Sequence, residues 1–89
     1  MTVRSSRMTV TTAATDLTVI DTDFTFGSSI DVLNLGAAAI YLGGADVTAA
    51  QGRPVDAGGS YACDLLSGEK LYAVAAAGTV EVSVLRTGV

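Results

Sequence analysis

Regularly spaced glycines constrain the fold of this chain more than any other feature. From Gly27 onward they recur at intervals of about eight to ten residues, the spacing of turn signals in β-sandwiches and small barrels. Glycine suits tight turns because it accepts positive φ. The segments between the glycines are rich in Val and Thr, which favour a half-buried pleated surface. The pattern predicts an all-β fold, a small antiparallel β-sandwich or β-barrel of about six to eight short strands joined by Gly-rich turns.

The stretch 80–85 shows the clearest strand pattern. Its three valines share one face, while Glu81, Ser83 and Leu85 share the other. A slip of one residue would bury Glu81, so the pattern specifies the register of this strand.

Other elements follow from similar signals. Further strands are expected near Met8–Thr12, Asp16–Ile20, Ser29–Leu35, Ala39–Leu42, Ser60–Leu65 and Leu71–Val74. One helical turn is expected over Asp46–Gly52, capped by Asp46 and ended by Gly52. Extended chain is expected at Arg53–Val55, because Pro54 disfavours helix at the residue before it and donates no backbone hydrogen bond.

The N-terminus differs in charge from the rest of the chain. Arg4 and Arg7 precede the first acidic residue, Asp16, although the whole chain has a net charge of −4. We therefore expect a flexible N-terminal arm over residues 1–8, with Met8 at its end, and a single β-domain over residues 9–89. The arm either docks on an acidic surface of a neighbouring chain or is a frayed terminus with two solvated arginines.

The amino-acid composition narrows the classes of partner that the chain could bind. The acidic balance argues against a nucleic-acid binder or an anionic-membrane binder. No apolar stretch is long enough to span a bilayer, and the first residues lack the apolar core of a signal peptide, so a cytoplasmic site of synthesis is expected. The hydrophobic residues include many alanines and no Trp, which predicts a thin core supported by association with other chains.

The side-chain inventory argues against catalysis and cofactors. The chain has no His, which excludes the usual nucleophilic triads and a structural zinc site. Cys63 is expected to pack on a sheet face, and Lys70 to be a solvated turn residue. Asp21 and Asp23, with Asp16 nearby, are spaced as calcium ligands could be, but the segment lacks the turn glycine and terminal Glu of an EF-hand, so an acidic solvated loop is the default. No metal or other cofactor is predicted, and the chain is expected not to be an enzyme.

Three tyrosines fall in expected strands. Tyr41, Tyr61 and Tyr72 are interpreted as half-buried residues of the sheets, with a role as interface anchors as the alternative.

Several stretches resemble a pattern found in small virion proteins of tailed bacteriophages. They lie between residues 34 and 88 and include the sequences YLGGADVT (41–48), GRPV (52–55), GE (68–69), LYAV (71–74) and VSVLRTG (82–88). Such stretches recur in head-associated proteins and at the ends of head fibre proteins.

The resemblance implies a head decoration or minor capsid protein, located on the outer surface of the virion capsid. Its implied partners are the major capsid protein and further copies of itself, as a trimer. The candidate contact residues are Arg4, Arg7, Met8, Tyr41, Arg53 and Tyr72. Two other readings stay open: a fibre or tail-associated module that contacts the host surface, and a head–tail connector subunit.

Overall fold

The computed structural model describes residues 2–18, 27–66 and 69–88, which form eight strands and no helix. The strands are β1 (Thr2–Val10), β2 (Thr15–Asp16), β3 (Ser28–Asn34), β4 (Ile40–Gly43), β5 (Arg53–Val55), β6 (Ser60–Leu65), β7 (Tyr72–Ala75) and β8 (Val80–Gly88). This confirms the all-β prediction.

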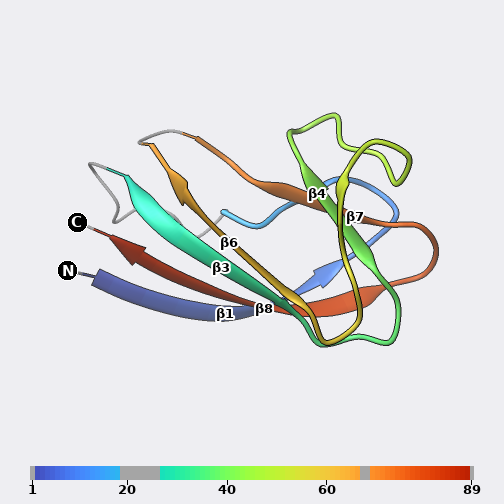
Figure 1. The fold of residues 1–89 in the computed structure, drawn as a ribbon, viewed down its shortest axis with the longest axis horizontal. Coiled ribbons are helices and arrows are strands. Elements are labelled where there is room, and N and C mark those ends of the chain that lie inside the picture. The colour runs from blue at the N-terminus through green and yellow to red at the C-terminus, as the bar shows by residue number, and fades with distance from the viewer. Residues whose placement is uncertain (1, 19–26, 67–68, 89) are drawn as a thin grey trace.

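Two antiparallel four-stranded sheets make up the fold. The first sheet has the order β1-β8-β3-β6 and the second the order β2-β7-β4-β5. In Figure 1 the long strands of the first sheet run together towards the end of the molecule that holds both chain termini. The arrangement is a sandwich, which decides between the two architectures that the sequence left open.

The core lies between the sheets and is built by strict alternation. In β8 the residues at 80, 82 and 84 are buried, whereas Glu81 and Leu85 are exposed, as the sequence predicts. β3 alternates in the same way along its whole length. The inner faces of the two sheets supply most of the buried apolar residues, among them Val10, Ile30, Val32, Ile40, Leu42, Val55, Ala73, Ala75, Val80, Val82 and Val84.

The loop between β4 and β5 folds back on the second sheet. The helical turn expected over 46–52 is reduced to turns, in which the Gly52 amide donates to the Thr48 carbonyl at 2.8 Å. A Cβ atom at Gly52 would lie 2.6 Å from Cβ of Tyr41, so only glycine allows this close approach. The extended chain expected around Pro54 is confirmed, and it forms β5 at the edge of the sheet, where a missing backbone donor is tolerated.

The N-terminal segment corrects one prediction. Residues 2–8 do not form an arm, because they belong to β1, which pairs residue by residue with β8 from Thr2 to Val10. This ladder satisfies the backbone polar groups on one side of the segment. Arg4 and Arg7 are tolerated there because an edge strand leaves its charged side chains in solvent. Deleting residues 1–7 would therefore remove most of a strand from the fold.

The strand expected over Asp16–Ile20 is described only as far as Thr18, since residues 19 and 20 lie outside the described part of the chain. Within that part, Thr15 and Asp16 pair with β7, and a turn follows through Thr18. Within the described parts of the chain, no helix has the length and apolar character needed to cross a membrane.

Candidate functional site

An open hollow of about 300 Å³ lies on the outer face of the first sheet. Its lining residues come from three adjacent strands: Asp31, Leu33, Ser60, Ser83 and Leu85. We call this area, defined by these five residues, the sheet hollow. All five occupy outward positions, because each alternates with a core residue on its strand.

Two leucines give the sheet hollow its apolar character. Leu33 and Leu85 expose 38% and 43% of their surface, respectively. The ladder between β3 and β8 brings them together, since Leu33 is opposite Ser83 and Asp31 is opposite Leu85. Val3 on β1, exposed by 58%, extends the apolar surface of this face towards the chain termini. Exposed apolar side chains gathered on one sheet face are typical of an interaction surface.

Side chains with polar oxygen atoms surround these two leucines. Asp31 supplies a carboxylate, and Ser60 and Ser83 supply hydroxyls. Farther along the same face, the hydroxyl of Ser29 donates to Asp64 at 2.6 Å. The sheet hollow therefore offers apolar contact together with hydrogen-bond acceptors, which suits a partner that presents an apolar side chain beside a donor or a cation.

The two arginines of β1 lie on opposite faces of this sheet. Arg7 is opposite Ser83 and lies on the same outer face as the sheet hollow. Arg4 is three residues away and so belongs to the other face, where it is opposite the buried Arg86. Both arginines are exposed.

The remaining candidate contacts lie elsewhere. Met8 packs against the core. Tyr41 and Tyr72 are half-buried and share the outer face of the second sheet. Arg53 places its guanidinium carbon 4.7 Å from the ring centre of Tyr61, at the edge of β5. The six predicted contact residues thus do not form one surface, and only Arg7 lies on the face that holds the sheet hollow.

Sequence reasoning missed the sheet hollow. A signal was present, because leucine at an outward position of an alternating strand is unusual and both Leu33 and Leu85 occupy such positions. The tyrosines were interpreted correctly as half-buried residues of the sheets, and Tyr61 packs against the core.

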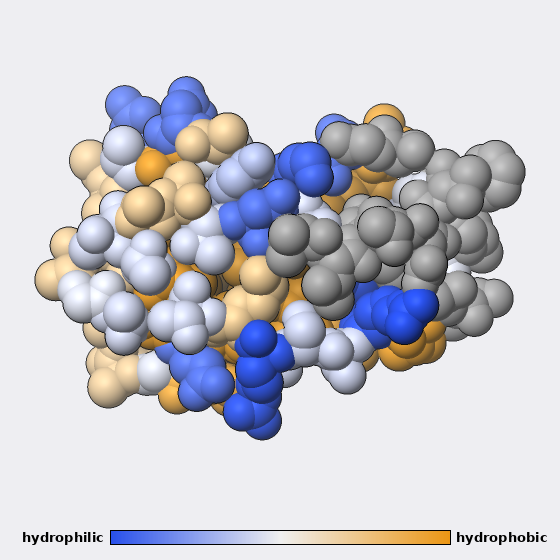
Figure 2. Space-filling model, turned by 180° about the vertical axis from the view of Figure 1, so that it is seen from behind, coloured by the Kyte–Doolittle hydropathy of each residue, from blue (hydrophilic) through white to orange (hydrophobic). Residues whose placement is uncertain are grey.

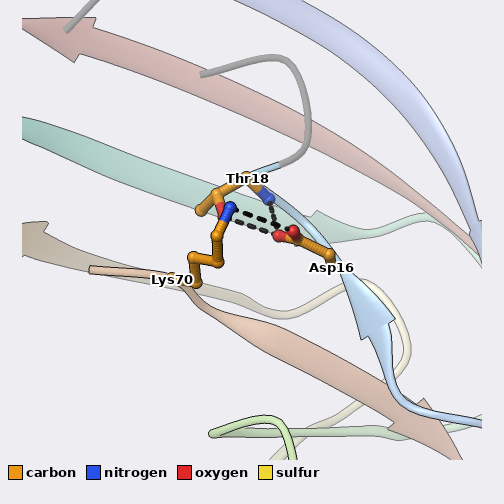
Figure 3. A network of polar contacts seen from close by, with 3 residues as sticks. All are labelled: Asp16, Thr18 and Lys70. Atoms are coloured by element: carbon orange, nitrogen blue, oxygen red, sulfur yellow. Dashed lines mark hydrogen bonds and ion pairs between the residues drawn. The ribbon is translucent and has the colours of Figure 1, made fainter. Parts of the chain in front are cut away.

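A polar cluster closes the end of β2 (Figure 3). The carboxylate of Asp16 accepts from the Thr18 amide at 2.7 Å and from the Thr18 hydroxyl at 2.5 Å. The Lys70 ammonium lies 3.4 Å from the same carboxylate. Burial alone would raise the pKa of Asp16, but these hydrogen bonds and the ammonium lower it below its ordinary value. Lys70, expected to be a solvated turn residue, is thus an exposed partner of Asp16.

The residues of the calcium hypothesis lie mostly outside the described part of the chain. Asp21 and Asp23 lie outside the described residues, and Asp16 is already held by Thr18 and Lys70. Within ranges 2–18, 27–66 and 69–88, no three His, Cys, Asp or Glu side chains are grouped as metal ligands.

Cys63 is a packing residue of β6. It is half-buried and contacts the core, as predicted. Burial raises the pKa of its thiol, and the neighbouring carboxylate of Asp64 raises it further. A raised pKa keeps the thiol protonated and weakly nucleophilic at neutral pH.

Viewed from behind, the molecule presents a mixed surface (Figure 2). Strongly hydrophobic atoms are visible there in small separate areas between polar side chains.

No protein-family model matches this chain, and searches of curated proteins and of solved structures returned no match.

Proposed function

We propose that this chain is an accessory structural protein of a tailed-bacteriophage capsid, a decoration protein that binds the outer surface of the head shell and stabilises it. The sheet hollow carries the proposal, because it combines two exposed leucines with a carboxylate and two hydroxyls on one sheet face. The resemblance of residues 34–88 to small virion proteins supports the choice of the capsid as partner.

The proposed contact places a major capsid protein on the outer face of the first sheet. Leu33 and Leu85 act as apolar anchors near the centre, where contacts to a partner contribute most of the binding free energy. Asp31 and the two serines orient a donor group of the capsid protein. Arg7, at the border of the same face, contacts an acidic group of the shell.

Copies of the chain associate as trimers on the shell in this proposal. Tyr41 and Tyr72, on the outer face of the second sheet, and Arg53 at its edge, remain available for contacts between copies. Such an arrangement needs no cofactor and no catalytic group, only a stable β-body with a docking face.

The docking face can be tested by sedimenting the purified chain with phage shells prepared without it. The double variant Leu33→Ser, Leu85→Ser should bind at least about tenfold more weakly, since two exposed leucines lose their burial against the shell. Leu66→Ser removes a leucine exposed by 72% outside the sheet and should bind like the unchanged chain. Equal binding by the double variant would contradict the assignment of the docking face.

The capsid assignment has its own test. Quantitative mass spectrometry of purified virions should find the chain in hundreds of copies per particle. A few copies, or about a dozen, would place it in a fibre, a collar or the tail. Its absence from the particle would remove the proposed function altogether.

A further inference from the structure

β1 forms an open edge of the first sheet. It stands at the end of the strand order and pairs with β8 on one side. Figure 1 shows it along the outer margin of the sheet, with the chain terminus at its free end. Among the described residues, no strand pairs with its other side. The backbone N–H and C=O groups of alternate residues therefore point away from the sheet.

This edge is better suited to pairing than the short edges of the second sheet. β2 has two residues and β5 has three, one of them Pro54. β1 has nine residues, contains no Pro or Gly, and keeps an unbroken register against β8. Four of its nine side chains are the small Thr or Ser. An edge of this length without a bulge or a proline is a template for a further strand.

The charge of β1 determines which kind of strand could pair with its open edge. Arg4 and Arg7 are exposed on β1, and no acidic residue occurs before Asp16. The chain as a whole carries nine acidic and five basic residues. The edge is therefore a cationic strip on an acidic molecule.

A second copy of the chain is a poor occupant of this edge. In any antiparallel register centred between residues 4 and 7, an arginine of one β1 lies directly or diagonally opposite an arginine of the other. Like charges at such cross-strand positions destabilise the pair. The arginines thus disfavour self-pairing and favour an acidic strand.

We propose that β1 binds an extended segment of a partner protein by strand addition, and that this segment carries two acidic residues three positions apart. Arg4 and Arg7 are themselves three residues apart and so project from opposite faces of the strand. Only a segment with the same spacing places one carboxylate beside each arginine. Backbone hydrogen bonds along β1 supply affinity, and the acidic spacing supplies specificity.

This surface shares one residue, Arg7, with the border of the proposed shell contact. The backbone edge of β1 and the leucines of the sheet hollow are otherwise separate, so either proposal can fail without the other.

Two synthetic peptides as long as β1 test the proposal. Both consist of Thr and Val with two Glu, placed three positions apart in one peptide and two positions apart in the other. Titration followed by NMR should show tighter binding of the first peptide, by about two- to fivefold, because the second pairs only one carboxylate with an arginine. Amide protons at alternate positions of β1 should become protected from exchange when the peptide binds.

Two matched variants distinguish the effect of a positive charge on β1 from a general effect of net charge. Arg7→Gln should reduce the preference for the three-position spacing, whereas Lys70→Gln, which removes the same charge at an exposed position outside β1, should leave it unchanged. Equal affinity for the two peptides, failure of both to bind, or protection outside β1 would overturn the proposal. Protection of the outward-pointing amides of β1 in the absence of peptide, together with dimer formation, would show a second copy as the occupant and would also overturn it.

Discussion

At the residue scale, Asn34 joins two parts of the fold through its buried side chain. Its amide nitrogen donates to the Ala38 carbonyl at 2.8 Å and to the Val55 carbonyl at 3.0 Å, and its oxygen accepts from the Gly36 amide at 2.9 Å. The side chain is fully buried, so its own polar atoms depend on these partners and not on water. One residue of the first sheet thereby holds a turn and the end of β5 in the second sheet.

Replacing Asn34 should therefore lower the free energy of unfolding. Asn34→Ala leaves the Val55 carbonyl buried without this donor and removes the part-buried bonds to Ala38 and Gly36, and we expect a loss of about 3 kcal/mol in the free energy of unfolding. Urea denaturation followed by circular dichroism measures this loss. Thr48→Ala, at an exposed position of a loop, serves as the control and should change stability by less than about 0.5 kcal/mol. A similarly small effect of Asn34→Ala would show that the network contributes little.

Asp16 gives stability a dependence on pH. Its pKa is lower in the folded chain than its ordinary value of 3.8, so folding favours the charged carboxylate. The stabilisation is fully present above the unfolded-state pKa and is lost as pH falls through the lower folded-state pKa. Asp16→Asn should accordingly show a smaller fall in unfolding free energy than the unchanged chain between about pH 5 and pH 2.

Lys70→Met tests the same pH dependence by changing the other member of the ion pair. It removes the ammonium but keeps the bonds from Thr18, so it should diminish the pH dependence only slightly, because the ion pair is largely exposed. Identical pH profiles for the unchanged chain and for Asp16→Asn would contradict the assignment.

At the element scale, the sequence predicts best where a strand has one buried and one solvated face. The alternation in β8 and β3 defines both the strands and their orientation, and β6 lies where its residues predicted it. The strand expected near Met8–Thr12 coincides with the end of β1, but the part before Met8 was missed, because an edge strand with exposed arginines looks like a solvated terminus in sequence. Its pairing depends on β8, more than 70 residues away in the chain, and local patterns do not report such a contact.

The sheet hollow illustrates the same limit for the candidate site. Leu85 was placed correctly on the outward face of its strand, and Leu33 falls in an expected strand. Their meeting depends on the register between β3 and β8, in which Asp31 is opposite Leu85. A register between distant strands is set by tertiary packing, so the two leucines could be identified individually but not as one site.

At the scale of the whole molecule, the chain has the dimensions of a folded monomer. Its radius of gyration is 12.1 Å, which equals the value of about 12 Å expected for a compact domain of this length. The described core is built mainly of Val, Ile and Leu, with Ala73 and Ala75 as its alanines, and is not the thin alanine core that suggested association. The remaining reason is on the surface, where Val3, Leu33, Leu35, Leu66 and Leu85 are large apolar residues exposed to solvent.

The proposed trimer should consequently form by reversible association of folded monomers. Sedimentation equilibrium over a range of micromolar concentrations should show an average mass rising from the chain mass of 8.9 kDa towards about three times that value. The thermal midpoint should rise with protein concentration over the same range, because association stabilises the folded chain by mass action. A constant monomer mass with an unchanging midpoint would contradict the trimer. Docking through the sheet hollow would still stand, because a folded monomer can present that face to the shell by itself.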